Sequence, residues 1–89
     1  MTIVRAQGCH FCDDAERVVL ALAERYPVDL RLVEMKSPAG LALVAVHRPA
    51  MNPLVLLDDV YFSAGRLPRL KLAALLVERA ARSSVGVTS

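Results

Sequence analysis

The spacing of hydrophobic residues changes several times along the chain, and each change predicts a new element. Residues 2–6 form a short apolar run that predicts a β-strand. Across residues 11–25 the apolar positions recur at intervals of three and four, which predicts a helix. Residues 28–34 alternate between apolar and polar, which predicts a second strand. The apolar face of this second strand is expected to carry Val28, Leu30 and Leu32.

The next segment begins with Ser37-Pro38, which resembles a helix cap followed by proline at the first helical position. Residues 41–47 are almost wholly apolar, so their periodicity fits a helix or a buried strand equally well. We favour a helix, because a second crossover is needed before the next strand. Residues 54–57 and 60–64 then predict a β-hairpin around a tight turn.

A last helix is predicted from Pro68 to about Arg82, and residues 83–89 are left as an unassigned C-terminal tail. We expect one domain over residues 1–82, in the order β-α-β-α-β-β-α. The class is α/β with a mixed four-stranded sheet, whose first two strands are parallel with a right-handed crossover. The stripe of this last helix that is expected to be buried carries Leu70, Ala73, Ala74, Val77 and Ala81.

Composition narrows the class of protein further. The chain has 89 residues, of which 55% are hydrophobic and 22% charged, so we expect a small folded domain rather than disorder. It contains no apolar run of about 18 residues and no signal-peptide pattern at its start. The 11 basic side chains are scattered and balanced by 9 acids. We therefore expect a soluble, cytoplasmic monomer that binds neither membranes nor nucleic acid.

The two cysteines, Cys9 and Cys12, are the main chemical signal in the sequence. They form a C-x-x-C motif between a predicted strand and a predicted helix. Unpaired N–H groups and the helix dipole at such a helix start stabilise a thiolate, which is the nucleophile in disulfide exchange. A C-x-x-C motif inside a βαβ unit therefore indicates a redox-active pair.

Charged neighbours modulate this expectation. His10 lies between the cysteines, and as an imidazolium it would favour a thiolate, although it fits a solvated loop residue equally well. Asp13 and Asp14 would act against a thiolate, with a smaller effect than that of the backbone N–H groups. A metal site is a further alternative, but the second histidine, His47, has no ligand pair beside it, so we expect no metal.

Three motifs resemble the glutaredoxin-like family of the thioredoxin-like superfamily. The first is Cys9-His10-Phe11-Cys12 followed by two acids and an alanine, similar to small members with a Cys-His-Leu-Cys-like motif. The second is Asn52-Pro53 before an apolar strand, and the third is the turn of Ala64-Gly65-Arg66-Leu67. The resemblance implies a three-layer thioredoxin-like fold.

The resemblance also implies roles for individual residues. Cys9 would attack the substrate disulfide, and Cys12 would resolve the mixed disulfide. The bond between Asn52 and Pro53 would be cis, with the proline beside the cysteines and the backbone before it free to pair with an extended substrate. Substrate would be bound at Asn52, Pro53, Gly65 and Arg66.

We therefore expect a thiol–disulfide oxidoreductase that acts on protein or small disulfides with a thiol donor. Members of the family that use glutathione have a basic residue where this chain has Ala6, and two glycines where it has Ala64-Gly65. We expect no cofactor and only weak binding of glutathione. The alternatives are a non-catalytic adaptor with a vestigial motif, and a metal-binding module.

Overall fold

The computed structural model describes residues 1–88, with side chains for residues 1–82. Its four strands form one sheet in the order β2-β1-β3-β4. Strand β1 pairs with β2 in parallel and with β3 antiparallel, and β4 is antiparallel to β3. The predicted α/β class with a mixed four-stranded sheet is therefore confirmed. The elements are β1 (Thr2–Arg5), α1 (His10–Ala23), β2 (Arg31–Glu34), α2 (Pro38–His47), β3 (Leu54–Leu57), β4 (Val60–Ala64) and α3 (Arg69–Thr88).

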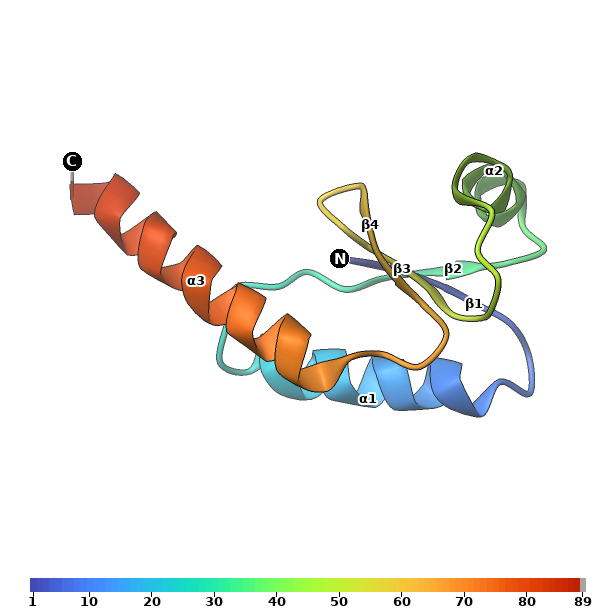
Figure 1. Cartoon of the computed structure of the whole chain (residues 1–89), viewed down its shortest axis with the longest axis horizontal. Helices are drawn as coiled ribbons and strands as arrows, with labels where there is room; N and C mark the ends of the chain where they lie inside the picture. The colour runs from blue at the N-terminus through green and yellow to red at the C-terminus, as the bar shows by residue number, and fades with distance from the viewer. Residues whose placement is uncertain (89) are drawn as a thin grey trace.

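Helices cover both faces of the sheet, with α1 and α3 on one side and α2 on the other (Figure 1). Neighbouring residues of a strand point to opposite faces, so β1 contributes to both cores. Ile3 joins the cluster that packs against α1 and α3, whereas Val4 joins the cluster that packs against α2. Both side chains are fully buried. The apolar strands of this sheet are thus explained by helices on both faces.

The segment that fitted either a helix or a strand is the helix α2. Ser37 caps it, with its hydroxyl oxygen accepting the Gly40 N–H at 3.0 Å. Gly40 is buried, and a Cβ built at this position would lie 2.0 Å from the carbonyl oxygen of Glu34. The missing side chain therefore allows the first turn of α2 to approach the end of β2 closely.

Strand β2 differs from the expected alternation. It begins at Arg31 instead of residue 28, and Val33 is its buried residue. Leu32, expected on the apolar face, is 49% exposed. Its register partner is Ile3, but β2 lies at the edge of the sheet, where a side chain has fewer neighbours. The irregular chain before β2 supplies Val28 and Leu30 to the core instead.

Helix α3 also differs from the expectation, in both its buried face and its length. Leu72 and Leu76 face the core, whereas Leu70 is 88% exposed and Val77 is 52% exposed. The helix carries two apolar stripes, so the periodicity alone could not show which one is buried. It continues past Arg82 to Thr88, through most of the predicted tail, and residue 89 lies outside the described residues. None of the described helices is long and apolar enough to cross a membrane.

Candidate functional site

Cys9 caps the N-terminus of α1. Its backbone is extended (φ −98°, ψ 107°), and its Sγ accepts the backbone N–H of Cys12 at 3.2 Å. Its carbonyl oxygen accepts the N–H of Asp13, also at 3.2 Å. The sulfur therefore takes the place of a capping oxygen at the N-terminus of the helix, where the positive end of the helix dipole lies.

Cys12 lies one turn further along α1 and is fully buried, whereas Cys9 is partly exposed. The pKa of the Cys12 thiol is raised to about 11, mainly by burial and in smaller part by the hydrogen bond with Cys9. A backbone hydrogen bond from Ala6 and the charge of Arg5 act in the opposite direction. Both cysteines are free thiols. One thiol of the pair is therefore accessible, and the other is enclosed and held in its protonated form.

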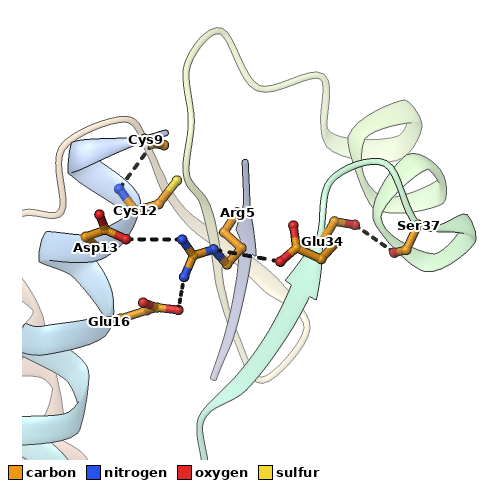
Figure 2. A network of polar contacts seen from close by, with 7 residues as sticks. All are labelled: Arg5, Cys9, Cys12, Asp13, Glu16, Glu34 and Ser37. Carbon is orange, nitrogen blue, oxygen red and sulfur yellow. Dashed lines mark hydrogen bonds and ion pairs between the residues drawn. The ribbon is translucent and has the colours of Figure 1, made fainter. Parts of the chain in front are cut away.

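Arg5, the last residue of β1, points toward α1 beneath the cysteines (Figure 2). Its guanidinium lies 2.5 Å from the carboxylate of Glu16 and 3.1 Å from that of Asp13, both on α1. The carboxylate of Glu34, on β2, lies 3.9 Å away. The hydrogen bond with Glu16 is the main cause that raises the pKa of Arg5. Arg5 thus links the first turns of α1 to the ends of β1 and β2.

The network extends to α2, because the carbonyl oxygen of Glu34 accepts the hydroxyl of Ser37 at 2.7 Å. Sequence reasoning missed this cluster and assigned no role to Arg5. A signal was present: Asp13 and Glu16 are three apart, so they share the helix face that follows a strand ending in arginine.

The charged neighbours of the cysteines are arranged differently from the expectation. Asp14 forms ion pairs with Arg69, at the start of α3, and with Arg17 at 3.8 Å. Asp13 is also paired, as described above, so arginines offset the negative charge of both aspartates. His10 is an exposed residue in the first turn of α1 and not a loop residue.

A second predicted group lies around the start of β3. The Asn52–Pro53 bond is cis, as expected. The carbonyl oxygen of Pro53 accepts the N–H of Gly65 at 3.0 Å. Gly65 has a positive φ of 92°, and a Cβ there would lie 3.3 Å from the Cβ of Met51. The structure therefore brings together three of the four predicted substrate-binding residues: Asn52, Pro53 and Gly65.

Strand register places this group at the same end of the strands as the cysteines. Leu54, the first residue of β3, pairs with Val4 near the end of β1, and the chain runs from that end to Cys9. Contact between Pro53 and the cysteine loop stays a prediction. Arg66, the fourth predicted residue, is exposed and lines a separate groove of about 380 Å³ with residues 67–71.

A cavity of about 600 Å³ opens at the ends of β1 and β2, beside the chain that leads to Cys9. Its charged residues are the already paired Arg5 and Glu34, together with the exposed Lys36. It offers room for a ligand, and its lining residue Gln7 lies two positions before Cys9 in the chain. It is lined by Arg5, Ala6, Gln7, Glu34, Met35 and Lys36.

Cys9, His10 and Cys12 were also considered as metal ligands. Among the residues that the structure describes, no group of three or more His, Cys, Asp or Glu side chains is placed to hold a metal ion. The other histidine, His47, is the last residue of α2.

No family model, no curated protein and no solved structure matches this chain. The resemblance to the glutaredoxin-like family is therefore carried by the three motifs alone. Any functional conclusion has to come from the geometry around the two cysteines.

Proposed function

We propose that the protein is a thiol–disulfide oxidoreductase in which Cys9 is the nucleophile and Cys12 the resolving thiol. The observation that carries this proposal is the asymmetry of the pair. Cys9 is partly exposed at the positive end of α1, whereas Cys12 is fully buried and its pKa is raised to about 11. Disulfide exchange needs one accessible sulfur that reacts first and a second sulfur protected until the first has reacted.

The arrangement of elements supports a thioredoxin-like fold of the glutaredoxin-like kind as part of the proposal. The sheet order β2-β1-β3-β4, with a parallel first pair and an antiparallel hairpin, is the order expected for this fold. The pair α1 and α3 on one face with α2 on the other gives its three layers. In that fold the C-x-x-C motif stands at the start of the first helix, where this chain has Cys9.

The proposed reaction has two exchange steps. The Cys9 thiolate attacks one sulfur of the substrate disulfide, forms a mixed disulfide and releases the other substrate sulfur as a thiolate, which takes up a proton. Cys12 then loses its proton and attacks the sulfur of Cys9. The second substrate sulfur leaves as a thiol, and the protein keeps a Cys9–Cys12 disulfide. Two electrons have passed to the substrate, and an external thiol donor returns them.

Protein or small disulfides are the proposed substrates, and a reactive dithiol suits a reducing compartment such as the cytoplasm. Two surfaces at one end of the strands could receive these substrates. One is the cavity at the ends of β1 and β2, and the other is the backbone around Asn52 and Pro53. Arg5 does not stand free for an anionic ligand such as glutathione, since Asp13, Glu16 and Glu34 already surround it.

Trapping of the mixed disulfide tests the proposal directly. In Cys12→Ser the second step is blocked, so we expect a stable covalent adduct with a model disulfide peptide, seen by mass spectrometry. Cys9→Ser is the matched control, and it should form no adduct although the buried thiol is still present. The wild-type pair should have a reduction potential between roughly −270 and −180 mV, the range of thioredoxins, glutaredoxins and isomerases.

Two outcomes would contradict the proposal. A Cys12→Ser protein that forms no adduct at any pH would favour a binding module that has kept the fold without the chemistry. An adduct on Cys12 in the Cys9→Ser protein, but none on Cys9 in the Cys12→Ser protein, would reverse the two roles.

A further inference from the structure

Helix α3 has a second apolar stripe that takes no part in the core. It contains two large exposed residues, Leu70 (88% exposed) and Val77 (52% exposed). Ala74 and Ala81 are exposed on the same side. The intervals of four, three and four residues are those of the narrow seam along which two helices pair in a coiled coil. An exposed apolar seam of this spacing is a surface that a second helix can cover.

The stripe is accessible to a partner. The core-facing residues Leu72 and Leu76 lie on the opposite side of the helix, so the stripe points away from the sheet. Figure 1 shows α3 running past the sheet and past α1, so that its C-terminal half projects from the body of the molecule. A second helix can therefore lie along it.

We propose that this stripe pairs with the same stripe of a second copy of the chain, with the two α3 helices antiparallel. In this arrangement Leu70 faces the partner's Ala81, and Ala74 faces the partner's Val77. Every layer then combines one larger and one smaller side chain, which keeps the two helices evenly spaced. A parallel pair would instead stack leucine on leucine and alanine on alanine, with alternately crowded and empty layers.

Charge favours the same arrangement. Lys71 and Glu78 are both exposed and flank the stripe on one side, seven residues apart. In the antiparallel pair each Lys71 lies beside the partner's Glu78, which gives two symmetric ion pairs across the two-fold axis. In a parallel pair, Lys71 and Glu78 would instead face the uncharged Ala73 and Ala80 of the other chain.

The pairing surface is small. The stripe from residue 70 to residue 81 spans about 17 Å of helix at about 1.5 Å per residue, so we expect a reversible dimer that dissociates in the micromolar range. The cysteine motif lies at the other end of the molecule from the C-terminus of α3 (Figure 1). Both copies of Cys9 therefore stay accessible, and the pairing is independent of the proposed redox chemistry. This proposal departs from the monomer expected from the sequence.

Sedimentation equilibrium of the full chain across the micromolar range tests the pairing. The wild-type protein should dimerise, and Leu70→Glu should raise the dissociation constant at least about tenfold. The matched control is Val60→Glu, because Val60 is also a largely exposed residue (66%) but lies on the hairpin, so its dissociation constant should not change. Circular dichroism melts check that both variants fold.

A charge exchange tests the antiparallel direction. Lys71→Glu and Glu78→Lys should each weaken the dimer several-fold, because like charges then face each other, and the double variant should recover affinity. Each change also removes an intramolecular contact, of Lys71 over the Phe62 ring (5.4 Å) or of Glu78 with Arg82 (3.7 Å). The double variant loses both, so recovery comes only from pairs between the chains.

Three results would overturn the inference. The first is a protein that stays monomeric throughout the micromolar range. The second is a dimer that Val60→Glu weakens as much as Leu70→Glu does. The third is a dimer that the double charge exchange fails to restore, which would point to a parallel pair or to another surface.

Discussion

The different reactivity of the two thiols is the most direct consequence of the structure. Alkylation by iodoacetamide can follow each thiol alone, with Cys9 in the variant Cys12→Ser and Cys12 in the variant Cys9→Ser. The pKa of Cys12 is raised from the ordinary 9.0 to about 11, with burial as the largest cause. At pH 7 a rise of about two units lowers the thiolate fraction about 100-fold, and only the thiolate reacts. Cys12 should therefore react more slowly than an exposed thiol of ordinary pKa, by up to about 100-fold when the whole rise is present.

The pH profile separates the electrostatic effect from simple steric protection. If Cys12 is protonated at neutral pH, its rate should rise about tenfold per pH unit and level off only well above pH 9. Loss of Cys9 in the variant removes one hydrogen bond and one charge that raise this pKa, but it leaves burial, the largest cause, in place. Steric protection alone would lower the rate equally at every pH.

Unfolding provides the control. In concentrated denaturant both single-cysteine variants should react at the same rate, because burial and the helix start are lost together. The reasoning is refuted if folded Cys12 reacts as fast as folded Cys9, or if its rate levels off at or below pH 9. Either result would mean that the first turn of α1 does not enclose the second thiol.

Three other predictions follow from separate contacts. The folded pKa of Cys12 lies above the unfolded value of 9.0, so its contribution to stability is complete below pH 9 and is lost as the pH rises through 11. By pH 10 the free energy of unfolding in urea should have fallen by about 1.4 kcal/mol more for the reduced wild-type protein than for Cys12→Ala. Equal falls in the two proteins would contradict the raised pKa. Gly40→Ala should destabilise the protein by about 2 kcal/mol, although alanine is usually the better helix former, because the added Cβ would meet the carbonyl oxygen of Glu34. A higher melting temperature of the variant would contradict this close contact. Turnover with glutathione and its reductase should be about 10- to 150-fold less efficient than turnover with a dithiol donor, because Ala6 supplies no charge-assisted contact to glutathione. Efficient turnover with glutathione would contradict this prediction.

The order of elements could be predicted because their local signals agree. Ser37 and Pro38 mark the start of α2, and the structure places the cap there. The turn Asp58-Asp59 has left-handed φ values of 52° and 64°, as a two-residue hairpin turn requires. The position of the C-x-x-C motif at a helix start could be predicted because the spacing of hydrophobic residues changes after residue 6 from that of a strand to that of a helix.

The orientation of elements could not be predicted in the same way. Helix α3 has one apolar stripe through Leu72 and another through Leu70, and only the position of the sheet decides which is buried. Strand β2 is short and lies at an edge, so Leu32 on its expected apolar face is half exposed. The ion pairs of Arg5 likewise join α1 to β1 and β2, and no local pattern shows how these elements approach each other.

The position of Arg5 connects the fold to the proposed choice of substrate. The side chain alternates with Val4 on β1, so it turns to the face that α1 covers, where Asp13 and Glu16 lie. Glu34 adds a third carboxylate from β2. A carboxylate of a ligand in the neighbouring cavity would have to compete with all three of these for one guanidinium. If the proposed function holds, we therefore expect a disulfide that is recognised by its shape and backbone, as in an extended protein segment, more than one recognised by its charge.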